Sequence, residues 1–561
     1  MKKQIPIGIS DFRQLRTENY HFVDKSLLIK EVLNDSATVV LLTRPRRFGK
    51  TLNLSMLRYF FEQSKTTEQN RTLFSGLAIE NEPEFETHFG KYPVIFITFK
   101  DIKERNYETS VRMIQNVIAE EFRRFRFLAE SERLNEEERH NFLRVCKQEA
   151  HFEAYLSAIK DLSCYLAKHY GVNPIILIDE YDTPIHTAYT ENYYKDMIAF
   201  FKAFYGSALK DNVYLQKAVM TGILRVSRES IFSELNNVAV YSILSHSYSN
   251  KFGFTETEVQ QLLTDNDLLS HFSVVKEWYN GYVFGKTIIY NPWSILNYTA
   301  RYDEGAKPHW VNTASNDLIR ELVQNGPSSL QEEFEMLLKN IPLKKRLNEN
   351  IVFNDLKNDD TTIYSFLVFS GYLKAVDKEH IDKYDYYNLF IPNVEVEIVF
   401  HDIIQHWLNH SFDSNTKLRM LLKAVVEGDA KLFEKLLSEF VLKSLSYFMT
   451  CGKNIESVYQ AFILGMLINL EDRYDVSSER EAGYGRYDIA IIPKDLTQKG
   501  IIMELKIIDE FENETKDEAL KNAMLQIEDR QYEIELRRRG VQNIVKMAVT
   551  FDGKRVWAVA K

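Results

Sequence analysis

Three consecutive residues near the N-terminus, Gly49, Lys50 and Thr51, have the types and the order that bind a nucleotide phosphate. In such a loop, backbone N–H groups at a helix N-terminus surround the phosphates, the lysine adds positive charge and the hydroxyl holds Mg²⁺. The usual pattern also has a glycine at the position where this chain has Arg44. Taken alone, the motif is half of a phosphate-binding loop, and a basic turn explains it about equally well.

Acidic residues at the end of a later apolar run change that balance. Residues 175–178 read IILI and lead directly into Asp179 and Glu180. A buried strand that ends in such a pair is the usual companion of a phosphate-binding loop, because the aspartate helps hold Mg²⁺ and the glutamate activates the attacking water. A further apolar run reaches Thr221, where a hydroxyl can sense the γ-phosphate. Arg225 either stabilises charge there or is a surface arginine, and the two interpretations stay open.

A second set of charged residues lies near the C-terminus. Asp488 lies on one strand-like run, 486–493, and Glu504 and Lys506 lie on the next. Glu504 and Lys506 share one face because side chains alternate along a strand. Two carboxylates can hold one or two Mg²⁺ ions that activate water against a phosphodiester, while the lysine positions the nucleophile. Glu-x-Lys is common on exposed strands, but these runs are otherwise apolar, so their charges need a reason.

Two other groups of charged residues in this region have open interpretations. Glu456, on the preceding helix, is either a further acid or a solvated helix residue, and the second is the commoner case. The run Arg537-Arg538-Arg539 either touches a phosphate backbone or ends a solvated helix. Residues 451–561 hold 17 Lys and Arg against 20 Asp and Glu, so this region is no basic clamp for nucleic acid. Substrate binding then calls for the middle region, another subunit or a partner.

Apolar runs alternate with helical segments in the part of the chain that carries the first site. This alternation predicts a parallel sheet with helices on both faces. The predicted strands are 37–42, 92–99, 174–182 and 213–222, and a charge-rich helical region covers 102–170.

The rest of the chain shows two further patterns. Helices dominate from about 250 to 440, and one is predicted to start at Asn291, which can cap it ahead of Pro292. The C-terminal part is an α/β unit with predicted strands at 486–493, 499–508 and 543–551 and one helix between the last two. We therefore predict a P-loop domain over 1–275, a mainly helical lid or linker over 276–440 and a nuclease-like domain over 441–561.

The N-terminal half resembles the AAA-ATPase-like family, which is found mainly in bacteria and archaea. The resemblance rests on motifs that occur in order over roughly the first 300 residues: IPIGISDF (5–12), YHFVDKSLLI (20–29), TRPRRFGKT (43–51), LIDEYDTPI (177–185), TGILRVSRESIFSELNN (221–237), FGFTETEV (252–259) and WYNGYVF with YNPWSIL (278–296). In that family the Arg-Pro-Arg-Arg-Phe-Gly-Lys loop is itself the pattern, so the missing glycine is a family trait. The resemblance implies an additional-strand P-loop ATPase fold that binds ATP with Mg²⁺.

The nucleotide-binding residues that we expect on this basis come from the loop and from the strand ends. They are Arg46, Arg47, Phe48, Gly49, Lys50, Thr51, Leu52, Asp179, Thr221 and Arg225, with Thr51 and Asp179 on Mg²⁺ and Glu180 catalytic. We expect Arg46 and Arg47 to bring charge to phosphates that fewer backbone N–H groups reach.

The C-terminal region resembles the PD-(D/E)XK nuclease superfamily, in the branch often fused to this kind of ATPase. The resemblance rests on GRYDIAII (485–492), IIMELKI (501–507) and LQIEDRQY (525–532). It implies that Asp488 and Glu504 bind Mg²⁺, or Mn²⁺, and that Lys506 is catalytic. Gln526 and Tyr532 resemble the helix element of RecB-like members, with looser spacing, so Gln526 joins the expected catalytic set.

Composition limits the remaining possibilities. The chain has 561 residues and a net charge of −10, whereas non-specific nucleic-acid binders are usually basic. Its three cysteines, at 146, 164 and 451, are too far apart for a zinc site or a disulfide framework. No signal peptide and no apolar stretch of the roughly 20 residues needed to cross a bilayer is visible. We expect a cytoplasmic protein without a membrane partner.

Two functions from different classes fit these observations. The first is an ATP-binding and ATP-hydrolysing protein with Mg-dependent endonuclease activity on nucleic acid, DNA ahead of RNA, regulated by the ATPase domain. The alternative is a nucleotide-switched signalling or assembly ATPase in which the nuclease fold is a binding module. A homo-oligomer is compatible with either, because ATPases that use an arginine in trans often assemble.

Overall fold

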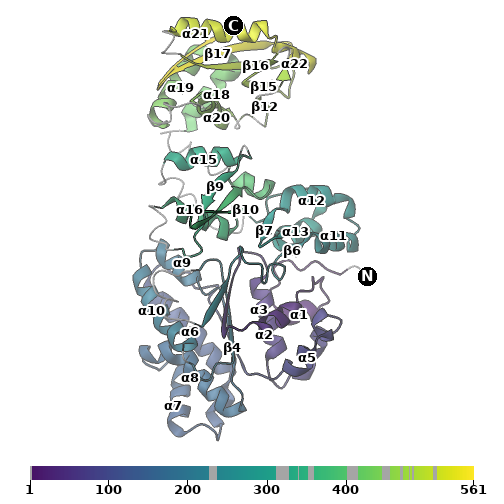
Figure 1. The fold of residues 1–561 in the computed structure, drawn as a ribbon, viewed down its shortest axis with the longest axis vertical. Helices are drawn as coiled ribbons and strands as arrows, with labels where there is room; N and C mark the ends of the chain where they lie inside the picture. The colour runs from purple at the N-terminus through teal and green to yellow at the C-terminus, as the bar shows by residue number, and fades with distance from the viewer. Residues whose placement is uncertain are drawn as a thin grey trace. The chain divides into compact units, whose positions relative to one another are not determined.

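The computed structural model divides the chain into two compact units (Figure 1). Unit 1 comprises Met1–Leu322 and Met336–Ile398, and unit 2 comprises Val323–Glu335 and Val399–Lys561, so helix α15 (Ser328–Leu338) is shared between them. The structure describes residues 3–210, 212–225, 237–310, 328–338, 340–351, 359–400, 415–444, 455–467, 470, 472–478, 481–482, 485–508 and 514–561.

Unit 1 is built on a parallel five-stranded sheet with the order β2-β3-β4-β1-β5. Its strands are β1 (Val39–Thr43), β2 (Val94–Thr98), β3 (Ile175–Asp179), β4 (Lys217–Gly222) and β5 (Val238–Tyr241). Strands β1 and β3 are buried along their whole length, as expected for apolar runs inside a helix-covered sheet. The four predicted strands are present, and β4 between β1 and β3 gives the additional-strand arrangement that the resemblance implies.

Strand β5 is missing from the sequence-based prediction. Its four residues, VAVY, are all half-buried and form an edge strand beside β1. A short edge strand buries too little apolar surface to give a run that stands out from its surroundings.

Helices lie on both sides of this sheet (Figure 1). One group holds α1 (Phe12–Thr17), α2 (Leu27–Asn34), α3 (Lys50–Phe61), α4 (Thr67–Arg71) and α5 (Pro83–His88). The other holds α6 (Tyr107–Arg124), α7 (Glu136–Lys147), α8 (Phe152–Tyr170), α9 (Thr183–Thr190) and α10 (Tyr194–Leu209). The charge-rich region predicted to be helical at 102–170 corresponds to α6, α7 and α8.

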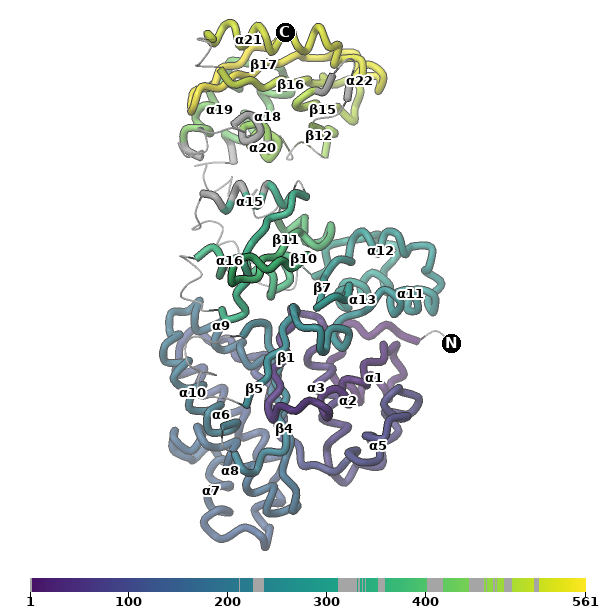
Figure 2. Tube along the Cα trace, in the orientation of Figure 1, coloured from purple at the N-terminus to yellow at the C-terminus, as the bar shows by residue number. Residues whose placement is uncertain are grey.

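The remainder of unit 1 mixes short helices with two small antiparallel sheets. The first sheet has the order β6-β8-β7 and the second β10-β11-β9, and β10 packs beside β7 (Figure 2). The elements are β6 (Phe254–Thr255), α11 (Glu256–Asp265), α12 (Phe272–Tyr279), β7 (Tyr282–Phe284), β8 (Thr287–Tyr290), α13 (Pro292–Ala300), β9 (Leu343–Arg346), α16 (Asp360–Ser370), β10 (Lys374–Ile381) and β11 (Tyr384–Phe390). Strands β10 and β11 carry charged and half-exposed residues, so no apolar run in the sequence predicts them.

Helix α13 starts where the sequence predicts. The side chain of Asn291 accepts hydrogen bonds from the backbone N–H groups of Trp293 at 2.9 Å and Ser294 at 3.3 Å, and Pro292 occupies the first turn. Because these are two of the N–H groups that a helix leaves without internal partners, the cap fixes the direction in which α13 leaves β8.

Unit 2 contains a mixed five-stranded sheet with the order β12-β15-β16-β17-β18. The strands are β12 (Tyr474–Ser478), β15 (Ile489–Pro493), β16 (Gly500–Ile507), β17 (Ile544–Asp552) and β18 (Arg555–Ala560), and a two-stranded ribbon joins β13 (Glu481–Ala482) to β14 (Gly485–Arg486). One face packs on α18 (Asn415–Glu427), α19 (Ala430–Ser444) and α20 (Ile455–Leu467). The other carries α21 (Lys516–Asp529) and α22 (Glu533–Arg538).

The two C-terminal helices replace a single predicted one. The chain breaks between them at Gln531, whose φ is 54°, and turns so that Tyr532 is completely buried. The sequence does not reveal this break, because Tyr532 falls close to the spacing at which a continuous helix would bury an apolar side chain.

Across the described residues, no helix is long and apolar enough to span a membrane.

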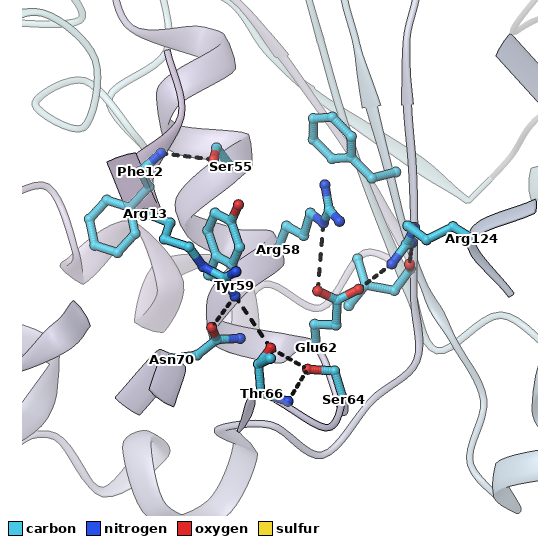
Figure 3. A network of polar contacts seen from close by, with 12 residues as sticks. Phe12, Arg13, Ser55, Arg58, Tyr59, Glu62, Ser64, Thr66, Asn70 and Arg124 are labelled. Carbon is cyan, nitrogen blue, oxygen red and sulfur yellow. Dashed lines mark hydrogen bonds and ion pairs between the residues drawn. The ribbon is translucent and has the colours of Figure 1, made fainter. Parts of the chain in front are cut away.

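A polar network at the C-terminal end of α3 ties unit 1 together (Figure 3). The guanidinium of Arg124, from α6, contacts Glu62, Glu121 at 2.6 Å and the carbonyl oxygen of Val94 on β2. Glu62 also lies 3.6 Å from Arg58 of α3. One arginine therefore joins α6, α3 and the start of β2.

We expect Arg124→Met to weaken this junction by about 2 kcal/mol, because two partly buried carboxylates and a carbonyl each lose one donor. Hydrogen exchange of β2 peptides in the full chain measures the effect. Arg123→Met, one residue earlier and exposed, is the matched control and should leave the exchange of β2 unchanged. Equal exchange in the two variants would show that the network does not hold β2.

Candidate nucleotide and metal sites

The first site is a tight loop between β1 and α3. Gly49 has a φ of 85° and immediately precedes the first residue of α3, and Arg47 also has a positive φ of 69°. Only glycine adopts such a conformation without strain, so Gly49 is required by backbone geometry. The N–H groups of the first turn of α3 remain directed out of the helix, where an anion can accept from them.

A buried carboxylate links this loop to two strand ends. Asp179, at the end of β3, accepts hydrogen bonds at 2.8 Å from the hydroxyls of Thr51 and Thr221, one on each oxygen, and a longer one from Thr98 at 3.3 Å. Asp179 and Thr221 have no exposed surface. Burial raises the pKa of Asp179, whereas its hydroxyl partners and Lys50 oppose that shift.

This arrangement fits a magnesium ion beside the nucleotide. Thr51 and Asp179 meet directly, as the two protein groups of a P-loop magnesium site do. Thr221 lies against Asp179 and not on the pocket surface, so any response of Thr221 to the γ-phosphate would pass through that carboxylate.

Lys50 is held inside the loop. Its ammonium group donates to the carbonyl oxygens of Arg44 at 3.2 Å and Pro45 at 3.0 Å, and the side chain is 4% exposed. Burial lowers the pKa of Lys50, and the nearby carboxylates, Glu180 first among them, act in the opposite direction. A polyphosphate offers this cation charged acceptors in place of neutral carbonyls, and such bonds are roughly twice as strong.

Glu180 differs sharply from its neighbour Asp179. Glu180 has a φ of 52°, lines the pocket and accepts a hydrogen bond from the hydroxyl of Thr183 at 3.1 Å. A non-glycine residue in this conformation is uncommon and turns the side chain away from the strand direction. One carboxylate of the pair is therefore buried among hydroxyl groups, and the other faces the pocket.

Asp182 is a further buried acid that sequence reasoning missed. Its carboxylate accepts from the backbone N–H groups of Ile223 at 2.8 Å and Leu224 at 3.0 Å, which fixes the chain where it leaves β4. Arg225 follows and is half-buried outside the pocket, and its carbonyl accepts from Ile351 at 3.3 Å. The run of acids in the sequence signalled Asp182, but only the fold shows what it binds.

Arg44, which replaces the usual first glycine, points away from the nucleotide side. Its guanidinium is fully buried and donates to the carbonyl oxygens of Thr43 at 2.7 Å, Tyr241 at 2.8 Å and Tyr248 at 3.1 Å. Burial lowers its pKa to about 9, and Glu31 opposes that shift. Arg44 therefore fastens the end of β5 to the loop and is a structural residue.

The pocket beside the loop has a volume of about 510 Å³, within the range of sites for small ligands. Of the predicted residues, those from Arg46 to Leu52 and Glu180 line it. The sequence did not identify its other walls, which come from the N-terminal segment, the residues after β2 and the region around α13. These include Pro6, Gly8, Ile9, Phe22, Val23, Lys100, Lys103, Lys251, Phe254, Pro292, Trp293 and Leu296.

Aromatic residues from beyond residue 275 grip the loop from outside. The guanidinium of Arg47 lies 4.1 Å from the ring centroid of Trp293, and the indole N–H of Trp310 donates to the carbonyl oxygen of Arg46 at 3.2 Å. The ring of Phe48 packs edge-on against Tyr282, with centroids 5.0 Å apart. The loop is thus shaped by tertiary contacts as well as by Gly49.

The second site lies in unit 2, on the face of the sheet that carries α21. Strands β15 and β16 are antiparallel neighbours, which brings Asp488, just before β15, to Glu504 and Lys506 on β16. One oxygen of Asp488 accepts from the backbone N–H of Leu505 at 2.7 Å. Glu504 is 2% exposed and accepts a hydrogen bond from the amide of Gln526 on α21. The structure therefore brings all four expected catalytic residues of this unit into one region.

The surroundings of this site support it from two sides. The amide of Gln526 also lies 3.5 Å from the hydroxyl of the buried Tyr532. Thr550 on β17 is the pairing partner of Lys506, and its buried hydroxyl has no hydrogen-bond partner among the described residues. A buried Glu504 beside Asp488 on an apolar sheet is a donor set that fits a divalent cation.

The remaining candidates in unit 2 have ordinary surroundings or lie outside the described set. Arg537 and Arg539 pair with Glu533 at 3.6 Å and Glu535 at 2.9 Å, one helical turn away, as on a solvated helix. The side chain of Glu456 lies outside the described residues. No group of three or more His, Cys, Asp or Glu that could hold a metal occurs in the part of the chain that the structure describes.

The fold and the loop define unit 1 as a P-loop nucleotide-binding unit, and unit 2 has the sheet of a PD-(D/E)XK nuclease. Residues 6–232 match the family described as predicted AAA-ATPase, and residues 454–561 match the PD-(D/E)XK nuclease superfamily. The chain thus contains a region that matches an AAA-ATPase-like family and, further along, a region that matches the PD-(D/E)XK nuclease superfamily. It is also 24% identical over 398 residues to a protein of Azotobacter chroococcum mcd 1 named "Uncharacterized protein in vnfD 5'region", covering 71% of this chain and 69% of that protein.

We expect Arg44→Gly, which restores the usual glycine, to destabilise unit 1 by about 3 kcal/mol, because three buried carbonyl oxygens lose their donor. Hydrogen exchange of peptides from β5 and the following loop measures the loss. Arg47→Gly is the matched control: that side chain is exposed and its φ is positive, so glycine should be tolerated to within about 0.5 kcal/mol. A stable Arg44→Gly variant would mean that the guanidinium is dispensable.

Proposed function

We propose that unit 1 binds and hydrolyses ATP and that unit 2 is a nuclease that depends on Mg²⁺. The observation that carries the first half is that Thr51, which lines the pocket, donates to the buried Asp179, which also accepts from Thr221 behind it. The second half rests on Asp488 and Glu504 sharing one sheet face with Lys506. The match of both parts to families with these activities supports the same conclusion.

In the ATPase half, the residues of this chain divide the work. Lys50 transfers its hydrogen bonds from the loop carbonyls to the β- and γ-phosphates, and Arg46 and Arg47 add charge from the rim of the pocket. Glu180 accepts a proton from the water that attacks the γ-phosphorus as the bond to the bridging oxygen breaks. Mg²⁺, held by Thr51 and Asp179, would neutralise charge on the phosphate oxygens.

The nucleoside end of ATP occupies the apolar half of the pocket. Ile9, Phe22 and Val23 from the N-terminal segment line the same pocket as Phe254 and Leu296 from the later part of unit 1. An adenine ring gains by contact with such walls, because it buries a large flat surface. This gives a physical role to the motif IPIGISDF, which the spacing of its residues does not reveal.

In the nuclease half, Asp488 and Glu504 would hold the metal, which would activate water and stabilise the negative charge on the phosphate oxygens. Lys506 positions the water, which attacks phosphorus while the bond to the leaving sugar oxygen breaks and that oxygen takes up a proton. Gln526 orients Glu504 through its amide. We propose cleavage within nucleic-acid chains, DNA ahead of RNA, regulated by the nucleotide state of unit 1, in a protein able to form homo-oligomers.

The test combines two variants of the full chain in one assay of DNA and RNA cleavage, with ATP, ADP or no nucleotide and with Mg²⁺ or Mn²⁺. We expect Asp488→Asn to reduce the rate of cleavage at least about 100-fold and to leave ATP hydrolysis intact. Lys50→Ala should reduce the rate of ATP hydrolysis by a similar factor and change how cleavage responds to ATP. Wild-type turnover of ATP without any cleavage would favour the assembly ATPase instead.

A further inference from the structure

A buried carboxyl group outside both sites connects two of the contacts that hold the phosphate-binding loop. Glu395 has no exposed surface, and its two oxygens accept hydrogen bonds from different segments. One oxygen accepts from the backbone N–H of Trp310 at 2.6 Å, and the other from the hydroxyl of Ser294 at 2.7 Å. Trp310 binds the carbonyl of Arg46, and Ser294 follows Trp293, whose ring lies under Arg47.

The contact with Arg46 sets the orientation of a peptide group in the loop. In a trans peptide the C=O and the following N–H point in opposite directions. Because the carbonyl of Arg46 is held by Trp310, the N–H of Arg47 is directed away from Trp310. Residues Arg46 to Leu52 line the pocket, so this N–H belongs to the set that can meet the phosphates.

Glu395 itself is fixed by close packing of its own segment. The side chain of Asn393 donates to the carbonyl oxygen of Asn280 at 2.7 Å and accepts from the N–H of Val396 at 3.1 Å. Gly281 has a φ of 97°, and a side chain there would lie 2.1 Å from the carbonyl oxygen of Pro392. This segment ends at Ile398, after which the chain continues into unit 2.

We propose that Glu395 is a positioning residue for the nucleotide site, which acts through Trp310 and Ser294 to hold Arg46 and Arg47 in the conformation that binds phosphate. This inference rests on the proposed function of unit 1 and adds a residue that lies outside the matched family region. The same contacts join the state of the loop to the segment that leads into the nuclease unit.

Protonation of Glu395 supplies a readout that a structural role alone would not give. Burial raises its pKa to about 7, and the N–H and hydroxyl donors partly oppose that rise. The titratable groups that face it are Tyr279, Tyr282 and His309; burial raises the pKa of both tyrosines and lowers that of His309 below its usual 6.5. Between pH 6.5 and 8 the carboxyl is then the group of this set that changes charge.

The sign follows from the hydrogen bonds. The carboxylate accepts from both donors, and charge-assisted bonds are about twice as strong as neutral ones. As the pH falls through about 7, the neutral acid holds Trp310 and Ser294 more weakly, and the loop should bind nucleotide less well. Nucleotide affinity of the wild type should therefore be highest above pH 7.

The experiment measures binding of Mg·ADP and of a non-hydrolysable Mg·ATP analogue to the full chain between pH 6 and pH 8.5. For the wild type we expect Kd to rise about fivefold toward the acid end, the size expected for losing about one hydrogen bond. Glu395→Gln should keep the acid-end Kd at every pH, and Glu395→Ala should bind at least about tenfold more weakly than the wild type at pH 8. Trp310→Phe, which removes the donor to Arg46, should weaken binding without adding fully to the effect of Glu395→Gln.

Glu121→Gln is the matched control, because Glu121 is also buried and accepts a backbone N–H, from Phe96 at 2.8 Å, but does not line the pocket. It should lower stability and leave Kd and its pH profile unchanged. A wild-type pH profile in Glu395→Gln, or equal effects in both variants, overturns the proposal while leaving ATP binding established.

A second readout needs no nucleotide. Tryptophan fluorescence of the wild type should show a transition near pH 7 that Glu395→Gln lacks, because the backbone N–H of Trp310 donates to the carboxyl and Trp293 directly precedes Ser294, which also donates to it. If the wild type shows this transition but does not bind ATP, the result counts against the proposed function and not against the positioning role. The same transition in Glu395→Gln overturns the positioning role.

Discussion

The carboxylate of Asp179 is the group on which the nucleotide site depends. A buried carboxylate is costly unless hydrogen bonds compensate it, and here the compensation comes from three hydroxyls on three different elements. Thr98 lies directly beside Asp179 in the pairing of β2 with β3, Thr221 comes from β4, and Thr51 from the first turn of α3. One charge thus fixes the strand ends and the helix start relative to one another.

The loop itself shows how a missing glycine is accommodated. A side chain at the position of Arg44 has to go somewhere, and the fold places it behind the loop, on carbonyl oxygens at the end of β5 and beyond. On the other side the loop is held by Phe48, Arg46 and Arg47 against aromatic residues. Packing from the later part of unit 1 therefore provides rigidity that a second glycine-dependent turn would otherwise supply.

This explains why residues up to Ile398 group with the nucleotide-binding sheet. The region from 276 onward supplies Tyr282, Trp293 and Trp310 to the loop. In unit 2 the two faces of the sheet have different roles. One face packs apolar residues on α18–α20, and the other places Glu504 under α21, so a buried acid and a conventional core share a strand.

Much of the framework, and the residues that we propose for the two sites, can be recognised in the sequence. Continuous apolar runs gave the central strands, because strands buried on both faces must be apolar throughout, and Gly49 to Thr51, Asp179, Asp488 and Glu504 were visible because charged residues beside such runs need a reason. The sequence did not predict the edge strand β5 or strands β10 and β11, because they bury little apolar surface. It also did not predict the break at Gln531, which accompanies the burial of Tyr532. The tertiary structure alone decided the partners of Arg44, the pocket walls from the N-terminal segment and the place of Glu395. These depend on groups hundreds of residues apart, and a spacing pattern along one chain carries no information about which of them meet.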